Sequence, residues 1–582
     1  MTDENGERYL VGFTDIESKA SEHTLDAWKF VLGEIDYHCK GAATDGVSAG
    51  VKLLFTIRNT MSDRAATEVK FHRLLEKYIS ECVPLIAATP DDQLEEGDRM
   101  VIRRLNNFFC ALHSLIHYAD LVDKTALEHE EQNFGGKENI PIFNPTFRQA
   151  GESAAARAIR LVCKSVSRGG DEKCGMYGHA RTFFLPILKA EFDAHSLPIT
   201  PYLRNRFSIL FHNASAIYCL YDHLVEFFTL HQSNHLLKSA LFDLKNDFIV
   251  SEIRGIGIIS KTIIAPLWNC IEDKSVDLSQ MNGVYGKLLQ FLEDSSADPQ
   301  FVLQGNSPFP EKYLRKDKYW DKIFAHDERF DGNTLSTLAI FLPALAIFTK
   351  RHFADHLPGG RYEHLQSSDV LGTDKENMIS ERSMAQWDNG HHQSPNKSEI
   401  ALEAKLCYAA NNVRQYIRNL DPASRRTLIL DSRAETPAVR ARFKERQSAL
   451  KQAAADALQQ KKVKAQEDEQ KRIYELVDLT AKVNGIGGLW KSADQVDAGL
   501  AKVKQEARGG AKGKLLDALK VQLAFRKKVL KQPLTDAKLW SYSEKGRNFD
   551  IEELSSRLKL VIAECPMSAA SAATTEPPEN IS

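Results

Sequence analysis

The segment VKLLFTIRNTMSDRAATEVKFHRLLEKYI, residues 51–79, decides how the fold of this chain is interpreted. Its first seven residues form an apolar run with the length and composition of a buried strand. The remainder has apolar residues at helical spacing, so Asp63 stands at the end of the strand or just before the helix. Residues 9–13 (YLVGF) and a helix capped by Ser21 or Thr24 precede it. Strand, helix, strand and helix in this order predict an α/β layer with a partly parallel sheet.

Helical periodicity dominates the rest of the chain. Residues 105–127 (LNNFFCALHSLIHYADLVDKTAL) predict one long amphipathic helix, and residues 151–356 predict a series of helices. A charged helix rich in alanine and glutamine is expected at 438–478, and two more helices between 512 and 562. We therefore expect an α/β plus all-α protein that is predominantly helical.

Size and composition limit the classes of function. A chain of 582 residues with 43% apolar residues predicts two to four soluble domains. A net charge of −2 means that a nucleic-acid surface has to come from a local patch. Nine cysteines without a C-x-x-C pair fit a reducing compartment. The proline in the apolar residues 334–357 favours a buried helix over a membrane span. We expect a nuclear or cytoplasmic protein that does not enter a membrane.

Asp63 is the first residue that could carry chemistry. A carboxylate at the C-terminal end of a buried strand lies where open α/β sheets place their sites. Nucleases that use paired Mg²⁺ ions need two or three such carboxylates. Taken alone, the more common explanation is a helix N-cap by Ser62 or Asp63, with Glu68 following.

Cys110 and His113 lie three residues apart and therefore on one face of the expected helix. A metal site would need two more ligands, so core packing is the simpler explanation. Glu381, in NMISERSMAQW, is 381 − 63 = 318 positions from Asp63 and would ordinarily form a surface ion pair.

Arg204 and Arg206 precede a helix crowded with aromatic residues, beginning at Phe207. Arginine beside an aromatic ring binds phosphate and stacks on a base, although an aromatic core helix with a basic start is the more common outcome.

These features occur in the order found in hAT-like DNA transposases, and the chain resembles that family over nearly its whole length. Each motif alone is weakly specific, while their joint order and spacing are more so. The stretches that carry the resemblance are residues 60–78, 106–119, 202–224, 256–268, 356–362 (HLPGGRY) and 519–530.

The resemblance implies a partial RNase H-like core interrupted by a large helical insertion. That family uses a D…D…E triad with Mg²⁺ to hydrolyse DNA and transfer strands. Asp63 matches the second aspartate and Glu381 the final glutamate, which makes both of them expected metal ligands. The implied division is residues 1–123 for the first part of the core, 124–358 for the insertion, 359–430 for the return to the core, 431–568 for a C-terminal helical region and 569–582 for a disordered tail.

Two further motifs are carried over by the resemblance. Cys110 and His113 match the family's C-x-x-H pair. Arg206 and Phe207 match an R-W pair whose tryptophan is implicated in stacking on a flipped base. Phenylalanine keeps the π-face and loses the indole N–H.

The N-terminus departs from the family pattern. Residues 9–13 run directly into the first helix, so they match the third strand of the core rather than the first. The strand bearing the first catalytic aspartate would precede Met1, and Asp15 follows the wrong strand. The family's N-terminal zinc-binding module is also missing. Because carboxylates of such a site act as a unit, we expect a truncated or decayed copy without transposition and with little or no nuclease activity.

Three hypotheses follow. The first is a transposase-derived protein with a degenerate core that binds DNA weakly and in a salt-sensitive way and forms a homo-oligomer. The second is an all-helical scaffold or adaptor, in which residues 9–13 and 51–57 are not strands of one sheet. The third, an unrelated α/β enzyme with a site at Asp63, lacks a supporting motif. The basic stretches are Arg103–Arg104, Lys350–His352, Arg440–Arg446, Lys461–Lys464 and Arg526–Lys528.

Overall fold

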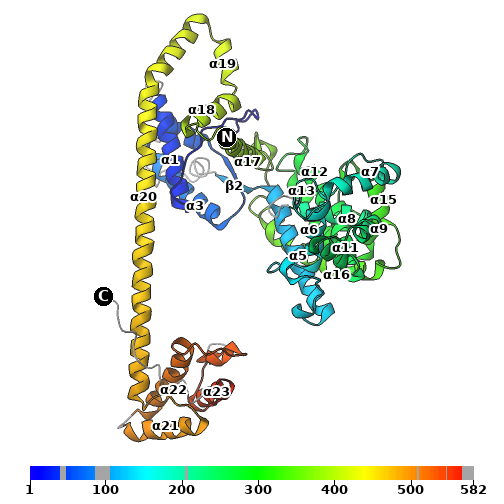
Figure 1. The fold of residues 1–582 in the computed structure, drawn as a ribbon. Coiled ribbons are helices and arrows are strands. Elements are labelled where there is room, and N and C mark those ends of the chain that lie inside the picture. Colours follow the sequence, from blue (N-terminus) through cyan, green and yellow to red (C-terminus); the bar gives the residue numbers. More distant parts are fainter. Residues whose placement is uncertain (40–46, 86–104, 203–207, 508–509, 545–546, 567–582) are drawn as a thin grey trace. The chain divides into compact units, whose positions relative to one another are not determined.

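The computed structural model describes residues 1–39, 47–85, 105–202, 208–507, 510–544 and 547–566. The chain is predominantly helical, as the sequence predicts (Figure 1). It divides into two compact units, Met1–Phe443 and Lys444–Ser582. Each unit contains its own cluster of buried apolar side chains.

A pair of short parallel strands lies at the centre of the predicted core region. Strand β1 (Asn59–Ser62) pairs with β2 (Asn106–Phe109), with Ser62 opposite Phe109. The Tyr362 hydroxyl accepts the Asn107 N–H and donates to the Asn107 carbonyl, both at 3.0 Å. The side chain of Tyr362, from the HLPGGRY motif, thus satisfies the outer edge of β2 in place of another strand.

The two strands expected from the sequence are wrong. Residues 51–57 belong largely to helix α2 (Ala49–Thr56), whose N-cap Ser48 accepts the Val51 N–H. Residues 9–13 belong to no helix or strand in the described part of the chain. Leu54 of α2 is fully buried, and an apolar run this short does not distinguish a strand from a buried helix. Helix α2 packs with α1 (Ser21–His38) and α3 (Ala66–Cys82) around a small core of their own.

The long helix expected over residues 105–127 begins later than predicted. Residues 106–109 form β2, and helix α5 (Ala111–Phe134) starts directly after Cys110. Pairing with β1 decides this, because the Asn106 and Cys110 N–H groups donate to carbonyls of residues 58 and 62.

The prediction of a series of helices over residues 151–356 is confirmed in the described part of that range. These helices pack with α5 around one large core that includes Phe184, Phe227 and Phe341, all fully buried. We call α5 and the helices that follow it through α16 the helical domain. Its helices are α6 (Ala154–Val166), α7 (Tyr177–Phe192), α8 (Ile209–Cys219), α9 (Tyr221–Leu230), α10 (His235–Leu244), α11 (Asp247–Ile259), α12 (Ala265–Glu272), α13 (Met281–Ala297), α14 (Gln300–Leu303), α15 (Lys318–Phe324) and α16 (Asp331–His352).

Helix α16 is, among the described residues, the one helix long and apolar enough to cross a membrane. In the fold it packs against α5, α11 and α13. Its buried side chains include Leu338, Phe341 and Leu345, and the Thr349 hydroxyl is hydrogen-bonded to the Tyr118 hydroxyl of α5 at 2.7 Å.

The chain then returns to the strand pair through residues 375–381 and helix α17 (Met378–Gln393). Helices α18 (Glu399–Ala410) and α19 (Val413–Asn419) follow. The Asn411 side chain donates to and accepts from the backbone of Leu10, at 2.9 and 2.7 Å. The N-terminal segment is thereby attached to this part of the unit.

The second unit is built on the end of helix α20 (Pro422–Gly485), which begins in the first unit. The charged helix expected at 438–478 and the two helices expected between 512 and 562 are all present. After α20 the unit contains α21 (Ala493–Glu506), the two expected helices α22 (Ala511–Lys528) and α23 (Ile551–Glu564), and the short strands β3 (Ser543–Glu544) and β4 (Arg547–Asn548). Leu519, Leu523 and Leu558 are fully buried in its core. The expected tail, residues 569–582, lies outside the described residues.

Candidate functional site

Asp63 follows a strand end, although the strand is β1 rather than the run at residues 51–57. Its side chain is exposed, and Oδ1 accepts the Ala65 N–H at 2.9 Å. The N-cap of α3 is Ala65, and no side chain caps that helix. Asp63 therefore stabilises the turn before α3 and is not the N-cap that the simpler explanation assumed.

The return segment meets the C-x-x-H turn at the end of β2. The Ala111 N–H donates to the Lys375 carbonyl at 3.0 Å, and the Asn377 N–H donates to Cys110 Sγ at 3.4 Å. Cys110 is fully buried, and burial raises the pKa of its thiol. Asn377 is the residue before α17, so these contacts set where the helix carrying Glu381 begins.

His113 lies close to Glu381, one of the two carboxylates that the sequence singled out. Its Nε2 is 3.4 Å from Glu381 Oε1, at a sequence separation of 381 − 113 = 268 positions. Burial lowers the pKa of His113, while the negative charges of Glu381 and then Asp63 act in the opposite direction. The same Asp63 charge adds to burial in raising the pKa of Glu68. The fold therefore brings Asp63, His113 and Glu381 into one electrostatic neighbourhood.

Lys375 anchors this return, and sequence reasoning missed it. Its side chain is only 7% exposed, and Nζ donates to the carbonyls of Cys270, Asp273 and Val276 at the end of α12. Burial lowers the pKa of this ammonium group. A cation at a helix C-terminus satisfies carbonyls that have no partner within the helix. A lone lysine in DKEN offers no sequence pattern that predicts this role.

Arg64 is the second residue that the sequence did not single out. Its backbone φ is +63°, a conformation that residues other than glycine rarely adopt. The guanidinium donates to the His352 carbonyl at 2.7 Å and to Asp355 at 2.6 Å, and it lies over the Phe109 ring. These contacts tie the turn after β1 to the end of α16. The adjacent Asp63 was the only signal that this turn mattered.

Among the described residues, no group of three or more His, Cys, Asp or Glu side chains is arranged to hold a metal ion. Asp63 and Glu381, the expected Mg²⁺ ligands, are directed to the Ala65 N–H and to His113. The side chains present therefore do not fit a two-metal site in this arrangement. Arg204, Arg206 and Phe207, the expected nucleic-acid contacts, lie outside the described residues.

Comparison with known protein families, with curated proteins and with solved structures found no match.

Proposed function

We propose that this protein is derived from a DNA transposase, with a degenerate RNase H-like core and residual binding to DNA. One observation carries the proposal. The chain leaves a parallel strand pair at Cys110 and His113, forms the helical domain, and returns so that Glu381 faces His113. Strand-end acid, C-x-x-H turn, helical insertion and returning glutamate are the parts that the resemblance implies, in the implied order.

We propose further that DNA cleavage by this site is absent or weak. Two-metal hydrolysis needs carboxylates that hold both ions at once. Here Glu381 Oε1 is close to an imidazole, and Asp63 Oδ1 accepts a backbone N–H. In this arrangement the two side chains therefore do not fit a pair of Mg²⁺ ions.

DNA contact is expected from a few exposed basic side chains. Arg526 of the basic stretch at 526–528 is fully buried and donates to the Trp490 carbonyl, so it serves the second unit's core. Arg442 is bonded to Glu34 at 2.7 Å and lies over the Tyr37 ring. Lys461, Lys462 and Lys464 of α20 are exposed, which makes this stretch the leading candidate for phosphate contacts.

The test measures the anisotropy of a short fluorescent DNA duplex titrated with the full chain over a range of salt concentrations. We expect weak binding whose affinity falls with salt. When the three lysines become glutamine, the salt slope should decrease by about 0.9 for each phosphate that the protein no longer neutralises. Neutralising Glu467, Asp468 and Glu469 on the same helix is the matched control, and it should strengthen binding. Binding that is absent at low salt, or insensitive to salt, contradicts the proposal.

Cleavage is measured separately on supercoiled plasmid with Mg²⁺. The wild-type protein and the Asp63→Ala and Glu381→Ala variants should all leave the plasmid at the background level. Robust cleavage by the wild-type protein that both variants abolish would show that the site is functional.

The second candidate function is a helical scaffold or adaptor that forms homo-oligomers. Two observations favour it: residues 9–13 and 51–57 are not paired strands, and α20 is a 64-residue helix whose residues 459–472 are all exposed. An oligomer in solution together with no affinity for DNA at low salt would select this function.

A further inference from the structure

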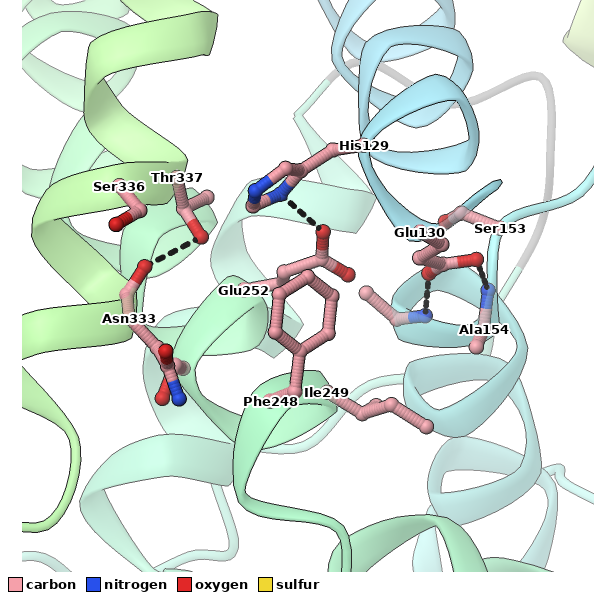
Figure 2. Close-up of polar contacts among 12 residues, drawn as sticks. His129, Glu130, Ser153, Ala154, Phe248, Ile249, Glu252, Asn333, Ser336 and Thr337 are labelled. Atoms are coloured by element: carbon pink, nitrogen blue, oxygen red, sulfur yellow. Dashed lines mark hydrogen bonds and ion pairs between the residues drawn. The ribbon is translucent and has the colours of Figure 1, made fainter. Parts of the chain in front are cut away.

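Two glutamates lie fully buried inside the helical domain, away from the candidate site. Glu130 comes from α5 and Glu252 from α11, and both have 0% exposure (Figure 2). Charged carboxylates are rarely buried without a cationic partner, because their desolvation costs several kcal/mol, by order of magnitude.

Glu130 is bound to the first turn of a third helix, α6. Its Oε2 accepts the Ala154 N–H at 2.7 Å and its Oε1 accepts the Ala155 N–H at 3.0 Å. Ser153, the N-cap of α6, accepts the Ala156 N–H. The carboxylate thus satisfies two N–H groups that have no partner within the helix, at its positive end.

Glu252 is bound on one side only. Its Oε1 is 2.9 Å from Nδ1 of His129, whose ring packs against Phe248 (Figure 2). Its Oε2 is buried and has no hydrogen-bond partner among the described residues. Burial lowers the pKa of His129, so the imidazole does not supply a positive charge near neutral pH.

Among the described residues of α6 and α11, the buried arginines are each paired with an acid other than Glu130 and Glu252. On α5, Asp123 accepts the Ser153 N–H at 2.9 Å and adds another negative charge. The α16 side chains that Figure 2 labels near this site are uncharged. The ion pairs are Arg157 with Asp243, Arg160 with Glu152 and Arg254 with Asp331. The uncharged α16 side chains are Asn333, Ser336 and Thr337.

We propose that the buried pair holds one proton, on Glu252, and forms a pH-sensitive clasp between α5, α6 and α11, which loosens when the proton is lost. The geometry assigns the charge to Glu130, which has two backbone donors, and the proton to Glu252, whose Oε2 has no donor. Loss of that proton leaves two negative carboxylates in the core, and the imidazole beside Glu252 is neutral.

The direction in which pH changes the stability of the clasp follows from the pKa values of the two carboxyl groups. Burial raises the pKa of both carboxyl groups, that of Glu252 to about 8, while the N–H groups of Ala154 and Ala155 act in the opposite direction on the pKa of Glu130. The unfolded chain releases both protons near 4.5, whereas the folded pair holds a proton up to about pH 8. The stability that the clasp provides is therefore complete below pH 4.5 and is lost as pH rises to about 8.

The test is hydrogen exchange of the full chain from about pH 5 to about pH 9, followed in peptides from α5, α6 and α11. Peptides from α22 correct for the intrinsic effect of pH on exchange. In the wild-type protein the opening equilibrium constant of these helices should rise about tenfold per pH unit up to about pH 8. In Glu252→Gln, which keeps the shape and removes the ionisation, the rise should disappear.

Infrared spectroscopy at about pH 6 supplies the second readout. We expect the wild-type protein to show the absorption band of a protonated carboxylic acid. The Glu252→Gln variant should lack this band. The matched control is Glu152→Gln, which breaks a buried ion pair with Arg160 and should weaken the domain while keeping both the band and the pH slope. A wild-type protein without the band or without the slope overturns the proposal, as does a Glu252→Gln variant that keeps the slope; if that variant does not fold, the wild-type measurements decide.

Discussion

At the scale of single residues, His113 is the point at which distant parts of the chain meet. Its imidazole faces Glu381 at 3.4 Å and also experiences the charge of Asp63. The pKa of His113 therefore reports on whether the two carboxylates lie near this imidazole in solution.

The corresponding prediction concerns the pKa of His113. Glu381→Gln removes the negative charge with the larger effect on His113, so the pKa of His113 should fall further below 6.5, and Asp63→Asn should lower it by less. NMR titration of the histidine ring protons measures both changes. Arg382→Gln, one position along, is the control for a local charge change. A His113 pKa that is identical in the wild type and in Glu381→Gln contradicts the geometry.

The residues of the candidate site could be named from the sequence, whereas their supports could not. Asp63, Cys110, His113 and Glu381 stood out because their types and order matched a known pattern. Lys375 acts through three backbone carbonyls, which leave no trace in the sequence. The same holds for any residue whose partners are backbone groups brought near only by folding.

At the scale of elements, tertiary contacts decided the strands. The apolar run at residues 51–57 lies largely in helix α2, while the more polar NTMS forms β1. Four residues of β-structure are stabilised by their partner strand, so their own composition is a weak guide. Long helices behaved differently, because their periodicity extends over many residues and averages out local exceptions.

The packing of α11 on α8 gives a prediction at this scale. A Cβ added at Gly257 would lie 2.9 Å from Ser215 Cα and 2.8 Å from Ile323 Cδ1. We therefore expect Gly257→Ala to destabilise the helical domain by about 1–3 kcal/mol, because the two helices would have to separate.

Gly286→Ala on α13 is the matched control, because nothing lies within 4 Å of the added Cβ. It should stabilise the domain by about 0.5–1 kcal/mol through helix propensity. Hydrogen exchange in α8 and α11 measures both variants. Equal effects of the two substitutions would mean that the helices do not approach as closely as described.

At the scale of the whole molecule, the chain contains two units with separate hydrophobic cores. A change confined to one core should therefore leave the stability of the other nearly unaltered. This differs from the behaviour of a single cooperative domain.

Leu519→Ala tests this separation. Leu519 is fully buried in the second unit, so its truncation should cost about 2–5 kcal/mol there. Hydrogen exchange should accelerate in α21, α22 and α23 and remain at the wild-type rate in α6 and α11. The exposed Leu560 of α23 provides the control, and Leu560→Ala should have little effect. Acceleration throughout the helical domain in Leu519→Ala would instead indicate one cooperative molecule.

The sequence by itself determined the helical character of this protein, the long charged helix α20 and the final helices, because each rests on periodicity within a continuous segment. It also marked Asp63, Cys110, His113 and Glu381. Only the tertiary structure decided that β1 and β2 pair, that the return segment meets Cys110, and that Glu130 and Glu252 are buried together. Those features depend on contacts between segments that are far apart in the chain. The free energy of such a contact depends on both segments and cannot be inferred from either one alone.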